Sequence, residues 1–429
     1  MKRYDAYKDS GVKWIGEIPS HWKVERLQSV ASCNDECLSE STLHNQEIEY
    51  VEIGNVDNVN GIRLTEKMLF ADAPSRARRI TKIGDIIVST VRTYLKAIAV
   101  IERDDLIVST GFAVIRPNHI NNKFIQIAML SDYFINSIVT NSYGVNYPAI
   151  TANKLIKLYI PIPPHSEQQA IVDYLKDKTL KIEQYVSARE RERELLSSLK
   201  QSEIANVVTK GLNPNVRMKD SGIPWIGMIP EHWEVKRLRH FIKFVSVKGH
   251  GEKPLLSVTR EQGVIERDVE SKEENHNFIP DDLSGYKLVR KGQFVINKMK
   301  SWQGSYGVSD YEGIVSPAYY VCDLTFPCKK FFSMAIRSKA YIPFFTQYSK
   351  GIRVDQWDLS PIGLKSIPFI VPPIEEQQAI VDYIEAKLSK IDSCMADLQA
   401  EIDYLKEFKQ RLISDVVTGQ ICVAEPQKG

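Results

Sequence analysis

The side chains that most often carry out catalysis are present, but their spacing does not build a recognisable catalytic site. Glu385 and Lys387 form a Glu-x-Lys triplet of the kind that nucleases use, yet the triplet lies in a stretch whose periodicity predicts a long helix. The eight histidines form no cluster with metal-ligand spacing, and the sequence has no Gly-x-x-x-x-Gly-Lys-Ser/Thr loop for a nucleotide phosphate. The two Pro-Pro pairs follow Ile162 and Val371, so neither belongs to the Asn/Asp-Pro-Pro-aromatic motif of amino-methyltransferases. These patterns predict a binding protein rather than an enzyme.

Cysteine pattern and composition narrow the class of protein further. The six cysteines contain no Cys-x-x-Cys pair, and Cys33 and Cys37 have no second pair nearby to complete a zinc site. We expect reduced thiols and no metal. With 43% hydrophobic and 26% charged residues, the composition is that of a globular protein. No stretch approaches the ~18–20 apolar residues of a membrane span, and the N-terminal segment MKRYDAYKDSG lacks an apolar signal region, so we expect a cytoplasmic protein without a membrane partner.

Charge is distributed unevenly along the chain, although the net charge is only +2. Residues 211–375 carry 23 basic and 18 acidic side chains, a net charge of +5, whereas residues 376–418 carry 5 and 9, a net charge of −4. A net charge of +5 is modest for a domain that binds nucleic acid by itself. If this segment does bind nucleic acid, we expect partner subunits to supply further contacts to the backbone.

An internal repeat reveals the elements that would position any binding groups. Residues 8–27 (KDSGVKWIGEIPSHWKVERL) and 219–238 (KDSGIPWIGMIPEHWEVKRL) are identical at fourteen of twenty positions. Two further blocks recur in the same order, PPHSEQQAIVDY at 163–174 as PPIEEQQAIVDY at 372–383, and KQSEIANVVT at 200–209 as KQRLISDVVT at 409–418. The period of about 210 residues is too long for a solenoid. The chain is therefore expected to be two tandem copies of one module, each a globular domain followed by a helix.

The segments between the repeated blocks differ strongly. Segments 28–160 and 239–369 share only a faint skeleton, such as KIGDIIVS at 82–89 against RKGQFVIN at 290–297. The repeated blocks form a frame that is largely identical in the two copies, whereas the segments between them differ. This pattern indicates one scaffold that carries two different binding surfaces. Ordinary drift after duplication is the alternative, but drift would erode the frame as well. We expect mixed α+β inserts, with strands in the first copy around 48–53, 85–90, 97–101 and 111–116.

Each copy is predicted to end in a long helix. Over residues 376–419, apolar side chains recur at alternating steps of three and four for more than four heptads, which indicates a coiled coil. The matching helix, from 167 to about 209, has a more polar seam that includes the run ARERERE at 188–194. That run is either a solvated face or a set of arginines that meets acidic residues of the last helix, for example Arg193 with Glu401. Asp397 and Asp403 are the other acidic candidates.

These features predict an α+β protein in which two globular domains, here called the first and second readers, are separated by two long antiparallel coiled-coil helices. The two copies would then be related by a pseudo-twofold axis. Because the inserts differ, readers related in this way would contact two unlike, separated half-sites on a duplex. The predicted order is a first reader at 1–162, a first helix at 163–211, a second reader at 212–371, a second helix at 372–420 and a tail at 421–429.

The blocks GVKWIGEIPSHW, PPHSEQQAIVDYL and SDVVTGQI, doubled around divergent inserts, closely resemble those of the specificity subunit of type I restriction–modification enzymes. The resemblance covers essentially the whole chain. It implies a non-catalytic subunit whose two target-recognition domains each read one half of an asymmetric bipartite DNA sequence, while the helices set the half-site spacing. It also implies that the helices assemble two modification (methyltransferase) subunits and, through them, restriction (endonuclease and translocase) subunits. In the family S-adenosylmethionine, ATP and magnesium belong to those partners, so no cofactor is expected in this chain.

Contacts to DNA bases should come from polar or basic loops beside strands, since Arg and Lys recognise guanine and Asn and Gln recognise adenine. In the first reader, SRARR at 75–79 and STVRTYLK at 89–96 stand out, and NSYGVNYPAI at 141–150 lies just before the entry to the helix. The alternative for each residue is an ordinary surface loop. The candidates in this reader are Arg76, Arg78, Arg79, Arg92, Tyr94, Lys96, Asn146 and Tyr147.

The second reader offers loops at equivalent places. NKMKSWQGSYG at 297–307 follows the matching strand-like run, and its tryptophan is either a DNA contact or a core residue. SVTREQG at 257–263 and GIRVDQWDLS at 351–360 add further basic and amide side chains. The candidates in this reader are Arg260, Gln262, Lys298, Lys300, Trp302, Gln303, Arg353, Gln356 and Trp357.

Four tryptophans of the repeated frame are expected to serve packing rather than reading. Trp14, Trp22, Trp225 and Trp233 occupy matching positions in the two copies. A residue that reads a base should differ between two readers of unlike half-sites, and these do not differ. We therefore expect them to pack where each reader meets the helices.

Two other interpretations stay open. The divergent segments could bind two different proteins, which would make the chain a coiled-coil interaction scaffold with two binding heads, and the near-neutral net charge suits that role. Within the resembled family, the chain could also serve a methyltransferase alone, without a restriction subunit.

Overall fold

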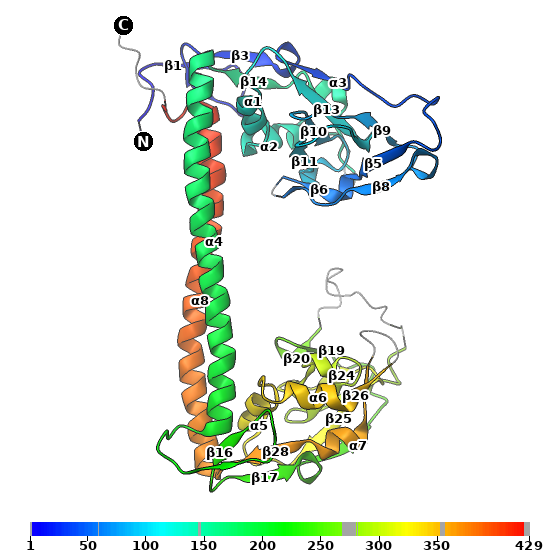
Figure 1. Ribbon diagram of the computed structural model, residues 1–429, viewed down its shortest axis with the longest axis vertical. Coiled ribbons are helices and arrows are strands. Elements are labelled where there is room, and N and C mark those ends of the chain that lie inside the picture. The colour runs from blue at the N-terminus through cyan, green and yellow to red at the C-terminus, as the bar shows by residue number, and fades with distance from the viewer. Residues whose placement is uncertain are drawn as a thin grey trace. The chain divides into compact units, whose positions relative to one another are not determined.

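The computed structural model describes residues 2–58, 60–144, 147–267, 280, 282–351 and 357–423 (Figure 1). The chain divides into two compact units, one formed by residues 1–189 with 400–429 and the other by residues 190–399. Each unit contains one β-rich reader together with parts of both long helices, α4 (His165–Lys210) and α8 (Ile374–Val417), which pack together. The predicted α+β class with two readers and two long helices is confirmed.

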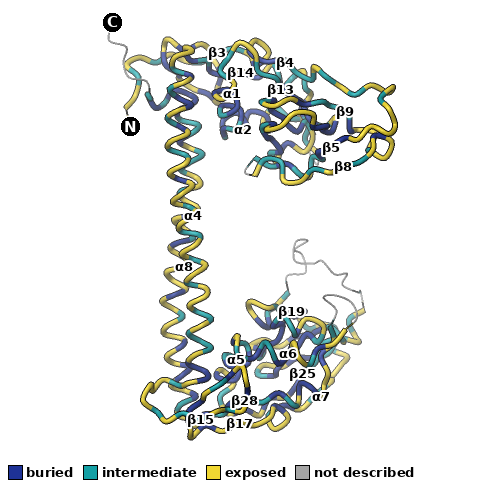
Figure 2. The backbone as a smooth tube through the Cα atoms, viewed as in Figure 1, coloured by how far each residue is buried: buried dark blue, intermediate teal, exposed yellow. Residues whose placement is uncertain are grey.

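The same four-stranded antiparallel sheet lies at the centre of both readers. Its strand order is β11-β10-β13-β4 in the first reader and β23-β22-β25-β18 in the second. The central strands β10 (IIVS) and β22 (FVIN) are buried along their whole length. Buried backbone, in dark blue, gathers inside each reader (Figure 2). The sheets consist of β4 (Ala31–Cys33), β10 (Ile86–Ser89), β11 (Ile98–Val100) and β13 (Phe112–Pro117), matched by β18 (Ile242–Val245), β22 (Phe294–Asn297), β23 (Tyr306–Val308) and β25 (Tyr319–Leu324). The faint sequence skeleton is therefore a structural correspondence.

The readers differ in the strands added to this common sheet. The first reader has a second sheet of order β8-β5-β12-β9, in which β5 and β12 run parallel. In the described part of the second reader, the pairs β19–β20 and β21–β24 take its place. The added strands are β5 (Glu47–Val51), β6 (Val56–Asp57), β7 (Gly61–Ile62), β8 (Glu66–Leu69), β9 (Ala77–Ile80) and β12 (Leu106–Ser109), and in the second reader β19 (Leu256–Thr259), β20 (Gly263–Glu266), β21 (Lys287–Val289), β24 (Gly313–Val315), β26 (Ser349–Lys350) and β27 (Asp358–Leu359).

The repeated blocks form equivalent short strand pairs at the base of each reader. One antiparallel pair opens the reader, and a second joins an early strand to the strand that leads into the long helix. The start of each reader is thus hydrogen-bonded to its end, next to the helix. The pairs are β1 (Tyr7–Asp9) with β2 (Glu17–Pro19), β3 (Lys23–Arg26) with β14 (Tyr159–Ile162), β15 (Met218–Asp220) with β16 (Met228–Pro230), and β17 (Glu234–Arg237) with β28 (Pro368–Val371).

The common sheet is buried on both faces, because successive side chains of a strand point to opposite sides. In β10, Ile86 and Val88 join a core with the short helices, whereas Ile87 joins the apolar layer under the second sheet. The core on the helix side continues onto the long helices through Leu175 of α4 and Val416 of α8. A second core does the same in the other unit. The short helices are α1 (Asn122–Met129), α2 (Asp132–Thr140), α3 (Ala152–Leu155), α5 (Lys329–Ile336), α6 (Ile342–Tyr348) and α7 (Pro361–Ser366).

Prolines precede both long helices, and a glycine follows each of them. Each follows a Pro-Pro pair, and each is followed within two residues by a glycine in the left-handed region, Gly211 with φ +73° and Gly419 with φ +75°. Only glycine adopts this conformation without steric cost, so it ends a helix readily. In the first unit Nζ of Lys409 lies 2.6 Å from Oε1 of Glu183, and in the second unit Nζ of Lys200 lies 2.6 Å from Oδ1 of Asp392.

The polar run of α4 contacts α8. Nε of Arg189 lies 3.0 Å from Oε2 of Glu401 in the first unit, and Arg193 donates a hydrogen bond to Gln399 in the second. The hypothesis that these arginines meet acidic residues of the last helix is thus confirmed for Arg189. The specific pairing of Arg193 with Glu401 is wrong, since Glu401 meets the arginine one turn earlier. Within each unit, residues later in α4 contact residues earlier in α8. The two helix segments of each unit are therefore antiparallel.

Candidate nucleic-acid interface

A buried tryptophan connects the first reader to the start of its long helix. Trp22 is fully buried and donates its indole N–H to Oε2 of Glu167 at 2.9 Å. Nε2 of His21 lies 2.6 Å from Oε1 of the same carboxylate. Because hydrogen bonds to a charged acceptor are strong and directional, this carboxylate fixes the orientation of the reader on α4.

The second unit repeats this arrangement. Trp233, also fully buried, donates to Oε2 of Glu376 at 3.0 Å, and Nε2 of His232 lies 2.5 Å from Oε1. The prediction that Trp22 and Trp233 pack where reader meets helix is confirmed. Sequence reasoning missed the glutamates Glu167 and Glu376, although both stand at the same place in the repeated Glu-Gln-Gln block.

The other two frame tryptophans do not share this burial, so the packing prediction is wrong for them. Trp14 is 40% exposed and Trp225 is 41% exposed. Trp225 makes one edge contact with Phe344 of α6, with ring centroids 5.1 Å apart. Each tryptophan precedes by two residues a glycine with left-handed backbone, Gly16 or Gly227, in the tight connection between paired strands. In these seven-residue connections, 10–16 and 221–227, the indole ring is only partly covered.

The loop after β10 in the first reader is held in a strained conformation. Arg92 and Lys96 flank the 3-10 turn η4 (Thr93–Leu95) and have φ values of 49° and 52°. Left-handed backbone costs a residue other than glycine roughly 1–2 kcal/mol. Tyr94, between them, is 51% exposed. The loop therefore presents two cations and an aromatic ring at the end of a buried strand, as the sequence predicts.

The segment at 141–150 supports this loop. Thr93 donates its hydroxyl to Oγ of Ser142 at 2.8 Å. The guanidinium carbon of Arg92 lies 5.2 Å from the centre of the Tyr147 ring, within the range of a cation–π contact. Two residues predicted from separate loops, Arg92 and Tyr147, are thus brought together. Asn146 lies outside the described residues.

The loop after β22 occupies the equivalent place in the second reader. Trp302, in the turn η6 (Ser301–Gln303), lies against Trp357 with ring centroids 5.1 Å apart, and Lys298 pairs with Asp358 at 3.1 Å. Trp302 is partly buried, and its indole N–H has no hydrogen-bond partner within the part of the chain that the structure describes. By strand register, Trp302 stands where the first reader has Tyr94, and Lys300 stands where it has Arg92. Lys300 is exposed and Gln303 is partly buried beside the indoles. Arg353 and Gln356 lie outside the described residues.

The turn between β19 and β20 presents two more candidates. Arg260 and Gln262 are both exposed, and the backbone N–H of Gln262 donates to Oγ1 of Thr259 at 3.1 Å. The guanidinium of Arg337 donates to the carbonyl oxygens of Arg260 at 3.1 Å and of Glu261 at 2.7 Å. Sequence reasoning missed Arg337, because no local pattern indicates that it reaches a turn more than seventy residues away.

Comparison with known proteins agrees with this geometry. Residues 19–188 match the family model of the type I restriction modification DNA specificity domain. Over 97% of its length the chain is 23% identical to a Methanocaldococcus jannaschii protein assigned as the specificity subunit of type I restriction enzyme MjaX, of which 98% is covered. Over nearly its whole length, the chain is therefore similar to the specificity subunits of type I restriction–modification enzymes. The MjaVIII specificity subunit of the same organism is 24% identical over 48% of this chain and 49% of its own length.

A solved chain shares the fold of this specificity subunit. It comes from a study of complex assembly and conformational transition of the type I R-M system, and it aligns with a TM-score of 0.67 at 21% identity, over 94% of this chain and 99% of that chain. These similarities support a non-catalytic DNA specificity subunit of a type I restriction–modification system. Among the described residues, no group of His, Cys, Asp or Glu could hold a metal ion, and no helix is long and apolar enough to cross a membrane.

The basic run at 75–79 of the specificity subunit is engaged within its own reader. Nη2 of Arg76 lies 2.7 Å from Oε2 of Glu52, and hydrogen bonds to Tyr50 and Glu52 raise the pKa of its guanidinium. Arg78 lies over the ring of Phe70, with the guanidinium carbon 4.8 Å from the ring centre. Arg79 is partly buried on β9. Of the three predicted arginines, Arg76 is the exposed one.

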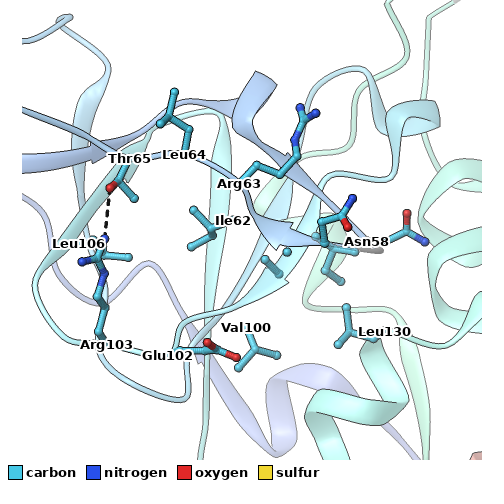
Figure 3. Close-up of a pocket in the computed structure, with 14 residues that line it drawn as sticks. Asn58, Ile62, Arg63, Leu64, Thr65, Val100, Glu102, Arg103, Leu106 and Leu130 are labelled. Carbon is cyan, nitrogen blue, oxygen red and sulfur yellow. Dashed lines mark hydrogen bonds between the residues drawn. The ribbon is translucent and has the colours of Figure 1, made fainter. Parts of the chain in front are cut away.

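The first reader also contains a crevice of about 730 Å³ between the β6–β7 hairpin and β11 (Figure 3). Arg103 donates to Oγ1 of Thr65 at 3.2 Å and pairs with Glu49, while Arg63 pairs with Asp57 at 3.3 Å. Because both guanidinium groups that line the crevice already have carboxylate partners, the crevice carries little uncompensated positive charge.

Proposed function

We propose that each reader recognises one half of an asymmetric bipartite DNA target, and that α4 and α8 set the spacing between the half-sites. The observation that carries this proposal is the equivalence of the loops after β10 and β22. Both follow the central strand of the same four-stranded sheet, and both pack against the segment that precedes the long helix. The contacting pairs differ, because Arg92 lies over Tyr147 in one reader and Trp302 lies against Trp357 in the other. One frame with two unlike surfaces suits two unlike half-sites.

The exposed members of these loops suit DNA chemistry. Arginine can donate two hydrogen bonds to a guanine edge, and amide side chains suit adenine. Contacts to phosphates fix the register of the protein without reading sequence. We assign Arg92 to a base edge and Lys96 and Lys300 to phosphates. Arg76 is a weaker candidate, since binding DNA would require it to leave Glu52.

Both long helices are proposed to dock two modification subunits, and restriction subunits through them. In the second unit, Leu195 and Leu199 of α4 are one turn apart and are 62% and 49% exposed. In the first unit, Leu180 and Tyr185 are 52% and 64% exposed. Apolar side chains left on a helix surface commonly mark a protein interface. S-adenosylmethionine, ATP and magnesium would be held by these partners, and the assembly would act in the cytoplasm, where its DNA target lies.

Single-molecule methylome sequencing would test the proposal. A host that expresses this chain together with the modification subunit encoded beside it is compared with a host that lacks this chain. We expect a methylated motif of two unlike half-sites across a fixed gap, present only with this chain. If the co-expressed complex is assembled but no such motif appears, the recognition role is wrong. An interaction scaffold with two binding heads would then be the better account.

A further inference from the structure

A second crevice, of about 630 Å³, lies in the second unit between α4 and the second reader. Ser197, Lys200 and Gln201 of α4 form one wall. The other wall is formed by the β19–β20 turn, the loop at Gly304 and the end of α5. The cationic side chains that line it are Lys200, Arg260, Arg337 and Lys339, and its acidic side chain is Glu261.

Most of this positive charge is not compensated within the unit. Lys200 pairs with Asp392 at 2.6 Å. No ion pair involves Arg260, Arg337 or Lys339 within the described ranges. When Glu261 and Asp392 are set against the four cations, a charge of +2 is left. A cluster of cations in a crevice, where water is restricted, favours an anionic ligand.

The contacts of Arg337 indicate that the positive charge in this crevice is held in place by the fold. Burial lowers the pKa of its guanidinium, yet arginine stays charged in proteins. Its described hydrogen-bond partners are the neutral carbonyls of Arg260, Glu261 and Tyr306, the last at 3.4 Å. These carbonyls direct the cation but do not neutralise it.

Two glycines make room for that guanidinium. A Cβ atom on Gly263, whose φ is +78°, would lie 1.8 Å from Nη1 of Arg337, and one on Gly307 would lie 3.2 Å from the same atom. Any larger residue at Gly263 would displace the guanidinium. The backbone of β20 and β23 is thus shaped to hold a partly buried cation at the mouth of the turn that carries Arg260 and Gln262.

We propose that this crevice binds the sugar–phosphate backbone of DNA next to the half-site read by the second reader. The inference rests on the proposed function and locates a contact that fixes the second reader on its half-site. Phosphates would supply the missing negative charge, and the hydroxyl of Ser197 and the amides of Gln201 and Gln303 are neutral donors of the kind that contact DNA backbones. The loops on either side carry the candidate base contacts, which favours DNA over an acidic protein segment.

The first reader does not reproduce this crevice. Its residue at the end of α1, where the second reader has Arg337 at the end of α5, is Leu130. Leu130 lines the first reader's crevice, whose two arginines, Arg63 and Arg103, each pair with a carboxylate. We therefore infer a backbone clamp that belongs to the second reader.

Lys339→Ala tests the clamp, because Lys339 is exposed and its removal should not disturb folding. The matched control is Lys330→Ala on the neighbouring helix α5, where the ammonium pairs with Glu385 at 2.8 Å outside the crevice. The complex of the full chain with its modification subunits is titrated at several salt concentrations with two duplexes, one carrying the methylated motif and one unrelated. Loss of one phosphate contact should lower the slope of log K against log salt by about 1 and weaken both duplexes equally. When salt is raised from ~50 to ~200 mM, the wild-type complex should therefore lose roughly fourfold more affinity than Lys339→Ala does. The control should keep the wild-type slope.

The outcomes separate this inference from the proposed function. If the wild-type complex does not prefer the motif duplex, the proposed function is wrong, and the clamp is wrong with it. If the wild-type complex prefers the motif but Lys339→Ala keeps its slope, only the clamp is wrong. If Lys339→Ala keeps the slope and weakens assembly with the modification subunits, the crevice holds an acidic segment of a partner protein, and the clamp is again overturned.

Discussion

The indole N–H of Trp22 donates to the carboxylate of Glu167 at 2.9 Å, so that a fully buried ring of the reader is hydrogen-bonded to the first turn of its long helix. The carboxylate also accepts from the hydroxyl of Tyr4 at 3.0 Å, and its other oxygen lies 2.6 Å from His21. Its negative charge beside the helix N-terminus is favoured by the helix dipole. The same relationship recurs between Trp233 and Glu376, which explains why two sequence blocks that are distant along the chain are repeated together.

Removing this acceptor should destabilise the first unit. We expect Glu167→Ala to cost ~1–3 kcal/mol, because it leaves the buried indole N–H without a partner. Glu167→Gln should cost less, since the amide oxygen still accepts one hydrogen bond. The measurement is hydrogen exchange across the full chain, which reports each unit separately even if unfolding is not two-state. Glu194→Ala, an exposed change on the same helix, is the control. Equal protection in Glu167→Ala and the control would contradict the assignment.

Arg92 should combine backbone strain with DNA recognition. Its φ of 49° suits glycine better, so Arg92→Gly should leave the reader as stable as the wild type or up to ~1 kcal/mol more stable. Both Arg92→Gly and Arg92→Ala should lose DNA affinity by ~1–3 kcal/mol and relax one base position of the first half-site. Binding to a panel of single-base variants of the motif, together with thermal unfolding, measures both effects.

Lys157→Ala, an exposed change in the same reader, controls for a general loss of charge. If neither the preferred sequence nor the salt dependence changes in Arg92→Ala, the assignment of Arg92 to DNA is wrong. If only the salt dependence changes, Arg92 contacts a phosphate rather than a base.

The sequence was sufficient to predict the helices and strands that depend on local periodicity and on prolines and glycines at their ends. The heptads of α8, its Pro-Pro start and its glycine end depend on neighbouring residues, as do the apolar runs of strands β10 and β13. Contacts such as Arg76 with Glu52, or Arg337 with the turn at Arg260, join segments that are far apart in sequence. No local pattern encodes such contacts, because they depend on which strands become neighbours in the folded reader.

Repetition also fails to distinguish two kinds of frame residue. Trp14 and Trp22 are repeated equally well, yet Trp14 is 40% exposed and Trp22 is fully buried. A repeat shows that both copies need the same residue, but burial depends on whether a helix covers that residue. The exposed pair, Trp14 and Trp225, is therefore repeated without belonging to the buried core of either reader.

The ion pair between Arg189 of α4 and Glu401 of α8 should contribute little to stability, but it should be specific to these two residues. Both side chains are partly exposed, at 38% and 45%, so we expect a coupling of ~0.2–1 kcal/mol. Arg189→Glu and Glu401→Arg should each lower the unfolding temperature of the first unit, and the double reversal should restore it. Arg193 provides the control, since its partner is Gln399 and Arg193→Glu combined with Glu401→Arg should not be restored. Equal rescue of both double variants would show non-specific charge compensation.

Arg337 should act on recognition through the turn that it holds. Arg337→Lys keeps the positive charge but cannot hold two carbonyls with one planar group. We expect it to keep the salt slope of the wild type while it relaxes discrimination at the second half-site. A merely structural role would instead lower stability without a change confined to one half-site. Methylome sequencing of the variant, read position by position, distinguishes these outcomes.

The indole pair Trp302 and Trp357 should affect only the half-site read by the second reader. Contact between the rings is expected to couple their effects by ~0.5–1.5 kcal/mol, so the double alanine variant should lose less affinity than the sum of the single variants. Trp302→Phe keeps an aromatic face and removes an indole N–H that has no described partner, so it should retain stability better than Trp302→Ala. The measurement is affinity for two sets of duplexes, each with one half-site altered. Because the first reader lies in the other unit, its half-site should be read as in the wild type. If both half-sites lost discrimination equally, the indole pair would be supporting the whole chain rather than reading DNA.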